Sequence, residues 1–546
     1  MSATPVALRG PDAPAASRRT PANPPHPRSR IALVNPPDPT SADDSRLTVP
    51  LGLGYLASEA RARGHHVDVH DLAVAVDPTP ADLAAAGLLG GYDVVGLTTY
   101  TETFLATMAI VDAVLAASPA TRIVLGGYHA SIMWREVLRD FPQVDAVVRN
   151  EGELPFGSLV DAWADGVDRP DVPGVAYGPG DACAGPDDVL DQDRLLHPVV
   201  DVLASSPYLS FTQPRTGRTV RTVAVVSSRG CPKRCSFCSI VVMSPRWRAR
   251  SVPSLMAELR ERYEDEPFGH VVFQDANLFV RSRRTVELAE AIHALDPSIT
   301  WSGTATADHV VRHADVLPRL AALGCAFLEI GIEAGNDASL ERFNKWTTVE
   351  MNERALALLA AQRIAVGLDF IMFEPEMTLA DLEANWRFLR RTDLVGTFPA
   401  DCVFSDLRLY PGTPARDAYE ARHGVRLPPH RLVPIAYDDP AVAGVRRVVH
   451  EYLGRHEHTS RRLVRRAMAW AASPAAVTGD EAAARQRASV LAVRLRHLPY
   501  RLLDAALGHA GPLAEGATLD ELGPALGVPA HLELQAAAEE ALRDAP

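Results

Sequence analysis

The chain has 546 residues, 47% of them apolar, and a formal net charge of −13. A chain of this length exceeds one compact core, so we expect a soluble protein of two to four domains. The negative charge disfavours nucleic acid as the main partner, and the absence of an apolar run of about 20 residues argues against a membrane helix. Six cysteines do not indicate a disulfide framework, so we expect a cytoplasmic protein.

The N-terminal part shows a change from a polar tail to an ordered domain. Residues 1–28 are rich in Pro, Ala and Arg, which predicts a disordered tail and not a secretory signal. Strand and helix patterns then alternate through "IALVNPP", "HVDVHDL", "YDVVGLTT", "RIVLGGYHAS" and "AVVRNEGE". This alternation predicts a parallel, doubly wound sheet over residues 29–207.

The predicted strand ends of this sheet carry hydroxyl groups and glycines. Ligands of doubly wound sheets bind beyond the carboxyl ends of the strands, and these residues suit a large polar ligand. Ordinary strand-exit turns would explain the same residues equally well. The residues concerned are Thr98, Thr99, Thr101, Gly126, Gly127 and Ser131.

A second alternating series follows and is succeeded by a helical region. It runs through "TVAVVSSRGC", "HVVFQDANLF", "ITWSGTATA", "FLEIGIEAG", "VGLDFIMFEP" and "DCVFSDLRLYPGTP". Six strand-like runs with helices between them predict a full or partial (β/α) barrel over residues 208–420, with its chemistry at the strand ends. Residues 421–546 predict helices whose arginines form a solvated face, and we expect these helices to cap the barrel mouth.

Three cysteines form a cluster directly after the first strand of this barrel. Cys231, Cys235 and Cys238 have the spacing C-x3-C-x2-C. Structural zinc usually takes four ligands in two pairs, and no second pair exists here. Three thiolates would instead leave one iron of a [4Fe–4S] cluster open to a substrate or cofactor. The other cysteines are isolated, and we interpret them as buried apolar residues: Cys183, Cys325 and Cys402.

This motif, with the aromatic Phe237 before its last cysteine, resembles that of the radical S-adenosylmethionine enzymes. Upstream, "NPP", "PLGLGYLAS", "GHHVDVHD", "GGYHAS" and "RNEGE" resemble the cobalamin-binding domain of the cobalamin-dependent branch. Downstream, "FQDANLF", "EIGIEAGN", "NKWTT" and "LYPGTP" are similar to that branch's barrel. The resemblance implies a Rossmann-like cobalamin domain, a partial (β/α)6 TIM-like barrel and a helical C-terminal region. It also implies three cofactors: a [4Fe–4S] cluster, S-adenosylmethionine and cobalamin.

The same resemblance implies roles for individual residues. Asp275 would accept a hydrogen bond from the ammonium of S-adenosylmethionine, Glu333 would hold its ribose hydroxyls, and Phe237 would pack near its adenine. A turn residue and a surface carboxylate are the alternatives for Asp275 and Glu333. Because Asp-x-His-x-x-Gly is missing, we expect base-off cobalamin without a histidine on cobalt. The candidate cobalamin contacts are Thr98, Thr99, Tyr100, Gly126, Gly127, Tyr128, His129, Ser131 and Glu151.

Two motifs depart from the family pattern. Relatives read "GxPGET" at the fifth barrel strand, whereas this chain reads "FEPEMT", with Phe373 and Glu374 on the expected rim. Glu374 therefore becomes a candidate catalytic residue in contact with the substrate. "NKWTT" carries Trp346 where glycine is usual.

The resemblance implies a C-methyltransferase that acts on an unactivated carbon of a small-molecule secondary metabolite. One S-adenosylmethionine would remethylate cobalamin, and a second would supply the radical that abstracts the substrate hydrogen. Cyclisation, ring rearrangement or oxidation with the same cofactors is the alternative. A non-catalytic metal-binding module is a third reading, against which the three-cysteine set argues. An external one-electron reductant of the flavodoxin or ferredoxin type is also implied, because no second cluster motif is evident.

Overall fold

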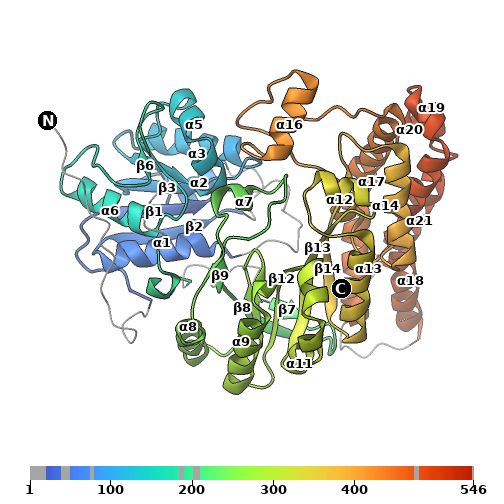
Figure 1. Cartoon of the computed structure of the whole chain (residues 1–546), viewed down its shortest axis with the longest axis horizontal. Helices are drawn as coiled ribbons and strands as arrows, with labels where there is room; N and C mark the ends of the chain where they lie inside the picture. Colours follow the sequence, from blue (N-terminus) through green and yellow to red (C-terminus); the bar gives the residue numbers. More distant parts are fainter. Residues whose placement is uncertain are drawn as a thin grey trace.

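The computed structural model describes residues 20–37, 49–73, 79–183, 190–200, 210–472 and 479–543. Two α/β domains lie next to each other, and a bundle of C-terminal helices covers the far side of the second domain (Figure 1). Most of the predicted tail, residues 1–19, and the predicted boundary at residue 207 lie outside the described residues. Within residues 20–28, Arg28 is bound to the first domain through ion pairs with Asp161 and Asp165.

The first domain is built on a six-stranded sheet in the order β2-β1-β3-β4-β5-β6. All neighbours are parallel except β6, which runs antiparallel to β5 at the edge. This confirms the predicted doubly wound sheet and adds an antiparallel edge strand. The strands are β1 Arg30–Asn35, β2 His66–Asp71, β3 Val94–Thr98, β4 Arg122–Gly126, β5 Ala146–Val148 and β6 Val175–Ala176.

Helices cover both faces of this sheet, which explains why its strands are apolar without alternation. One face packs against α1 (Leu51–Ala62) and α6 (Glu153–Ala164). The other face packs against α2 (Pro80–Ala85), α3 (Phe104–Ala117) and the helices that follow β4. These last two helices are α4 Gly127–Ile132 and α5 Trp134–Asp140.

The second domain is a seven-stranded sheet in the order β15-β14-β13-β12-β11-β8-β7. Six parallel strands follow one another in chain order, and β7 pairs antiparallel with β8. The two ends of the sheet, β15 and β7, are not hydrogen-bonded neighbours. The sheet is therefore the predicted partial barrel. Its strands are β7 Ser210–Thr212, β8 Thr219–Val225, β11 His270–Phe273, β12 Thr300–Thr306, β13 Cys325–Glu333, β14 Ala365–Phe373 and β15 Ser405–Asp406.

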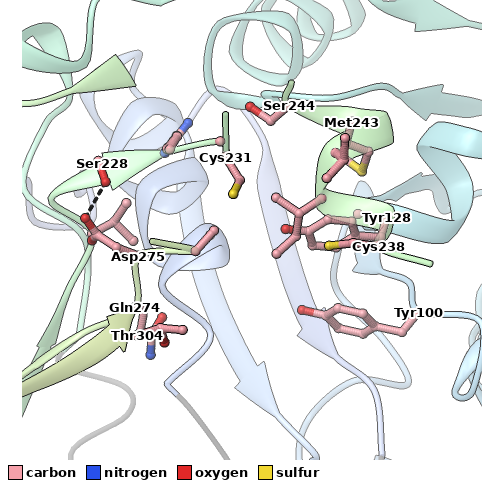
Figure 2. Close-up of a pocket in the computed structure, with 18 of the residues that line it drawn as sticks. Tyr100, Tyr128, Ser228, Cys231, Cys238, Met243, Ser244, Gln274, Asp275 and Thr304 are labelled. Atoms are coloured by element: carbon pink, nitrogen blue, oxygen red, sulfur yellow. Dashed lines mark hydrogen bonds between the residues drawn. The ribbon is translucent and has the colours of Figure 1, made fainter. Parts of the chain in front are cut away.

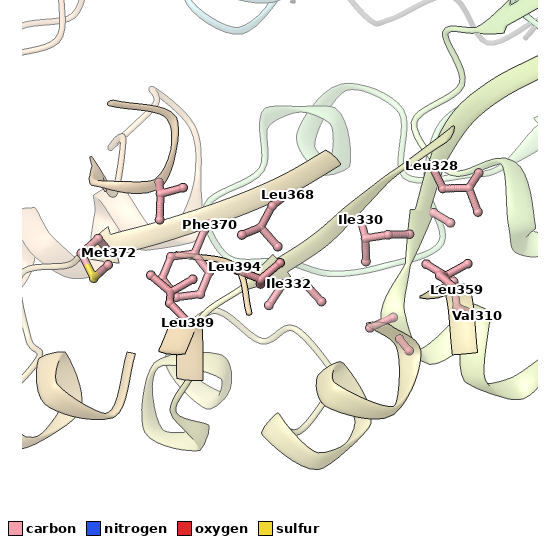
Figure 3. Close-up of a cluster of buried hydrophobic side chains, with 14 of the residues drawn as sticks. Val310, Leu328, Ile330, Ile332, Leu359, Leu368, Phe370, Met372, Leu389 and Leu394 are labelled. Atoms are coloured by element: carbon pink, nitrogen blue, oxygen red, sulfur yellow. The ribbon is translucent and has the colours of Figure 1, made fainter. Parts of the chain in front are cut away.

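Alternate residues of these strands face opposite sides of the sheet. Leu328, Ile330 and Ile332 of β13 point outward with Leu368 and Phe370 of β14, toward the helices that follow each strand (Figure 3). The residues between them on β13 face the interior and carry the polar groups of the site. The outer helices are α8 Val252–Asp265, α9 Ser282–Leu295, α10 Ala307–Arg312, α11 Leu317–Ala322, α12 Asp337–Arg342, α13 Val349–Ala361 and α14 Leu379–Arg391.

The C-terminal helices do not cap the barrel mouth, so that expectation was wrong. Val445 and Tyr452 of α17 (Pro440–Ala472) and Leu503 of α18 (Asp480–Gly508) share one core with Phe370 and Phe404. They therefore bury the outer wall beside the open β14–β15 edge, where apolar side chains need cover. The remaining helices here are α15 Ala400–Val403, α16 Pro414–His423, α19 Ala510–Ala514, α20 Leu519–Leu522 and α21 Val528–Ala541. In the described part of the chain, no helix has the length and apolarity needed to cross a membrane.

Candidate active site

A cavity of about 1140 Å³ is lined by both domains. The strand ends β1, β3, β4 and β5 form one wall, and the inner face of the second sheet forms the other. The three clustered cysteines lie between these walls. Because the carboxyl ends of both parallel sheets open into the same space, ligands of the two domains would meet there.

The cysteine loop, residues 230–238, depends on a glycine at its start. Gly230 has φ of 80°, and a Cβ at this position would lie 2.2 Å from the carbonyl oxygen of Arg246. Only glycine tolerates both the left-handed conformation and this contact. The short strand β9 (Ser228–Arg229) precedes the loop and pairs with β10 (Arg248–Ala249), and α7 (Ser239–Met243) lies between Cys238 and β10.

The three thiols of the cysteine loop face one space. Cys231 and Cys235 are buried, and Figure 2 shows the sulfur atoms of Cys231 and Cys238 directed into the cavity. Burial raises the pKa of Cys235 to about 11, while the nearby ammonium of Lys345 acts in the opposite direction. Among the described residues, no three His, Cys, Asp or Glu side chains close around one metal ion. A four-iron cluster needs each thiolate on its own iron, which suits three thiols that are spaced around a chamber.

Asp275 lines the cavity at the end of β11 but is largely engaged by its own chain. Its Oδ1 accepts the backbone N–H of Ser227 at 2.7 Å, and its Oδ2 accepts the hydroxyl of Ser227. The hydroxyl of Ser228 also donates to Oδ2 (Figure 2). Burial raises the pKa of this carboxyl despite those donors. Asp275 therefore anchors the turn that leads into the cysteine loop, and its role toward an ammonium group stays a prediction.

Glu333 ends β13 and forms a buried ion pair across the cavity wall. Its Oε1 accepts a hydrogen bond from Lys345 Nζ at 2.6 Å, and both residues line the cavity. Burial lowers the pKa of the Lys345 ammonium, but the carboxylate of Glu333 raises it by more. The pKa of Lys345 therefore lies above its usual value. Gly331 leaves room for this pair, because a Cβ there would lie 2.6 Å from Lys345 Nζ.

Polar groups on neighbouring strands complete this part of the wall. Ser302, Thr304 and Thr306 of β12 all face the cavity, as does Gln274 at the end of β11. Phe237 of the cysteine loop lies edge-on to Phe343, with ring centroids 5.5 Å apart. Together they form a chamber with hydroxyl, carboxylate and aromatic groups, which are the groups that recognise a nucleoside and an amino acid.

In the first domain, the cavity extends along the strand ends over Gly96, Gly126 and Gly127, a part of it that we call the first-domain slot. A Cβ on Gly127, whose φ is 85°, would lie 2.6 Å from Thr98 Oγ1, and one on Gly96 would lie 2.9 Å from Leu33 Cδ2. The slot continues to the stacked rings of Tyr100 and Tyr128, whose centroids are 6.0 Å apart. The atoms that a Cβ would meet belong to the protein itself, so these glycines allow the strand ends to pack tightly beneath the slot. Of the predicted cobalamin contacts, those that line the cavity are Thr98, Tyr100, Gly126, Gly127, Tyr128 and Glu151.

Three predicted contacts of this domain are not among the residues that line the cavity, and their roles toward cobalamin stay predictions. Thr99 is fully buried, and its hydroxyl donates to the Gly126 carbonyl and accepts the Ala130 N–H. Ser131 accepts the backbone N–H of Asn150 at 2.9 Å. His129 is held by Thr101 and His430, and burial lowers its pKa to about 3. These side chains shape the strand exit, and no histidine among the described residues lines the cavity.

Glu374, the predicted catalytic residue, is not among the residues that line the cavity, so its contact with a substrate stays a prediction. The carboxylate is 2% exposed, and its Oε1 accepts hydrogen bonds from Arg342 and Ser339. Its Oε2 accepts the backbone N–H of Glu376 at 3.0 Å. The neighbouring Phe373 belongs to the hydrophobic core. Glu374 therefore fastens α12 to the end of β14, which is a structural role.

Ion pairs between the domains were missed by the sequence analysis. Arg229 binds Glu153, and Arg248 binds Glu151, so both arginines of the β9–β10 pair reach the first domain. Lys345 was missed as well, although it stands in the quoted "NKWTT" motif. The sequence did carry a signal for Lys345, because this lysine belongs to a motif that resembles the family pattern. The partners of the interdomain ion pairs lie too far apart in sequence to be recognised without the structure.

Two family models match the two domains. The B12 binding domain matches residues 45–160, and the Radical SAM superfamily matches residues 225–389. The chain is a cobalamin-dependent radical S-adenosylmethionine enzyme. Its cofactors are those of the two domains: cobalamin in the first, and S-adenosylmethionine with a [4Fe–4S] cluster in the second.

Relatives of this radical enzyme differ in the reactions that their names state. It is 27% identical to the anaerobic magnesium-protoporphyrin IX monomethyl ester cyclase of Rubrivivax gelatinosus, covering 62% of each chain. It is 28% identical to an uncharacterized methyltransferase of Pyrococcus horikoshii, covering 70% of this chain and 82% of the other. The chain thus spans about three fifths of the cyclase's length, and both relatives leave its own reaction open.

A solved structure shares the fold of this radical enzyme over most of its length. The cobalamin-dependent S-adenosylmethionine radical enzyme OxsB, with aqua-cobalamin and S-adenosylmethionine bound, superposes with a TM-score of 0.69. The match covers 94% of this chain and 80% of OxsB at 18% sequence identity. At this identity the likeness is one of fold, and it extends through the C-terminal helices.

Proposed function

We propose that this chain is a C-methyltransferase that acts on an unactivated carbon of a small molecule. The single observation that carries the proposal is the shared cavity. It places the strand ends of the cobalamin domain opposite the cysteine loop and the inner face of the barrel. Methyl transfer to a substrate radical requires the methyl donor and the radical source to face the same substrate atom.

The residues present suit the three cofactors. Cys231, Cys235 and Cys238 would hold the cluster, and the Gly96–Gly127 slot would admit cobalamin. Glu333 and the hydroxyls of β12 would hold S-adenosylmethionine. When bound, these cofactors supply a carbon-centred radical and a transferable methyl group.

The protein itself positions and shields the reaction. The Glu333–Lys345 pair fixes a carboxylate acceptor beside the cysteine loop, since a buried carboxylate keeps its place only when it is compensated. Asp275 and its serine donors fix the turn before the cysteine loop. The interdomain ion pairs of Arg229 and Arg248 hold the two walls of the chamber against each other.

The substrate would enter on the side formed by the last barrel strand. Cys402, Ser405, Leu407 and Tyr410 line the cavity there and are remote in sequence from the cysteine loop. This wall mixes a thiol, a hydroxyl, an aliphatic side chain and a phenol. It suits a small organic molecule better than a polymer, because the wall lies inside a chamber and not on an open groove.

A second candidate function is a cyclisation or oxidation with the same cofactors. The observation that favours it is the 27% identity to a cyclase over 62% of this chain. The cavity serves both reactions equally, because both need a substrate radical beside the cofactors. The two reactions differ in whether the substrate gains a methyl group.

Anaerobic turnover of the reconstituted enzyme tests the proposal. S-adenosylhomocysteine and 5′-deoxyadenosine should form in similar amounts, and the product should gain the mass of one methyl group in place of hydrogen. Deoxyadenosine without S-adenosylhomocysteine would instead support the cyclase reading. A triple Cys231→Ala, Cys235→Ala, Cys238→Ala variant is the control and should lose cluster iron and both products. Zinc without iron in the purified wild type would overturn both readings.

A further inference from the structure

Trp346 is a surface residue that the proposed chemistry does not explain. Its side chain is 56% exposed, and its backbone has φ of 60°. A bulky residue in this left-handed region is an outlier, whereas glycine occupies it without strain. Strained backbone of this kind points to a local function. An exposed indole on a strained backbone is therefore a feature to be explained by what contacts it.

The surroundings of Trp346 place it on the outside of the cysteine loop. Its ring lies 5.6 Å from Lys233 Nζ, and its Nε1 donates to Asn344 Oδ1 at 2.8 Å. Asn344 Nδ2 in turn donates to the carbonyl oxygen of Arg234 at 2.7 Å. The indole is thus attached to the backbone between the first two cysteines. Lys233 spans the wall, because it lines the cavity and also faces the indole.

The charges around Trp346 are mostly positive. Lys233 forms a buried ion pair with Asp308, and Arg312 lies 3.5 Å from the same carboxylate with its side chain 63% exposed. Arg234 is exposed and forms no ion pair within the described part of the chain. Two cations, Lys233 and Arg312, therefore share one carboxylate, and Arg234 adds an exposed cation beside Lys233 in the chain, in a protein whose net charge is −13. We call the exposed side chains Pro232, Arg234, Arg312 and Trp346 the Trp346 surface.

We propose that the Trp346 surface is the docking site for a flavodoxin, the one-electron donor to the cluster. The inference rests on the proposed function, which needs such a donor. An acidic partner matches the basic surface, and the flat flavin edge matches an exposed indole. Trp and Arg are also the residues that most often dominate protein interfaces. One electron leaves the reduced flavin and one enters the cluster behind the loop, with no bond formed and no proton transferred at this surface.

Two variants separate docking from chemistry in the reconstituted holoenzyme. Trp346→Gly removes the indole and relieves the strained φ, so its melting temperature should equal or exceed that of wild type. Arg312→Gln removes one exposed cation. Both should cleave S-adenosylmethionine at the wild-type rate with titanium(III) citrate. With subsaturating reduced flavodoxin, Trp346→Gly should be about tenfold slower, and its Kd for oxidised flavodoxin by titration calorimetry should rise about tenfold.

Salt and a distant variant provide the controls. Flavodoxin-driven cleavage by wild type should fall as ionic strength rises, and this dependence should be weaker for Arg312→Gln. Arg494→Gln, an exposed arginine on α18, should behave as wild type in every assay. An unchanged flavodoxin Kd for Trp346→Gly would overturn the docking site. An equal loss with titanium(III) citrate would also overturn it. A wild type without cleavage under titanium(III) citrate would contradict the proposed function, while the Kd comparison would still decide the docking site.

Discussion

Single glycines decide whether the cofactor chamber can exist. Gly230 turns the chain into the cysteine loop, and Gly127 turns it from β4 into α4 beside the first-domain slot. Each has a positive φ and a neighbour that a Cβ would strike. A methyl group at either position would move a backbone segment that carries cofactor contacts. The chemistry thus depends on residues that contribute no functional group.

Gly230→Ala should lower both the stability and the cluster content of the protein. The strained φ and the contact with the Arg246 carbonyl together should cost about 2–4 kcal/mol, and the displaced loop should retain less iron. Iron per chain after reconstitution and the melting temperature measure the two effects. Gly217→Ala is the matched control, because Gly217 has φ of 66° but no atom near its Cβ position. Full iron occupancy in Gly230→Ala would show that the loop can relax around the methyl group.

The elements of both sheets could be predicted from the sequence because their signal is local. "IALVNPP" and "VGLDFIMFEP" are apolar runs that end at proline, and both become strands. The cysteine spacing likewise predicted a set of residues that the fold brings to one cavity. The ion pair of Glu374 could not be predicted, because its partner Arg342 lies 32 residues earlier in the chain. A lone carboxylate at a strand end has the same sequence signal whether it faces a substrate or an arginine.

Helix α17 buries one of its acidic side chains, Glu457. Glu457 is 8% exposed, and burial together with the nearby Asp401 raises its pKa to about 7. The folded protein therefore holds a proton that the unfolded chain releases above its ordinary pKa of 4.5. Folding stability must fall as pH rises through this window, because the folded state binds the additional proton.

Glu457→Gln should remove this pH dependence. Relative to wild type, the variant should gain roughly 2 kcal/mol of stability between pH 5.5 and pH 8.0, since the neutral amide needs no proton. Thermal unfolding of both proteins at the two pH values measures the gain. Glu451→Gln, at an acid of the same helix that pairs with Arg455, is the matched control. A difference that stays constant with pH would mean that Glu457 is ionised in the folded state.

At the scale of the whole molecule, a polar chain fastens the first domain to the segment after α16. Asp140 accepts from His430 Nε2 at 3.1 Å, so His430 Nδ1 is left to accept from His129 Nε2 at 3.0 Å. His129 Nδ1 then accepts from the hydroxyl of Thr101. The aromatic ring of Phe104 stacks on His430, with centroids 4.8 Å apart. This contact crosses about 300 residues of sequence, so no local pattern could reveal it.

His430→Ala should loosen the two domains without unfolding either. The buried His129 would lose its acceptor, which costs about 1–3 kcal/mol. Backbone amides of residues 127–140 should therefore exchange with deuterium faster than in wild type, whereas those of β13 and β14 should not change. Arg431→Ala, an exposed neighbour, is the control. Unchanged exchange in residues 127–140 would mean that the ion pairs of Arg229 and Arg248 hold the domains by themselves.

The two-walled cavity also sets an order of events during synthesis. The strand ends of the first domain are complete once Ala176 has been made, but the opposite wall is finished only at Tyr410. At about 5–20 residues per second, translation leaves the first wall uncovered for roughly 10–50 s. Cobalamin that is present during this interval meets a wall that the second domain does not yet face, whereas later cobalamin must enter between the two finished walls. We therefore expect the concentration of cobalamin at the time of translation to set the fraction of enzyme molecules that contain cobalamin.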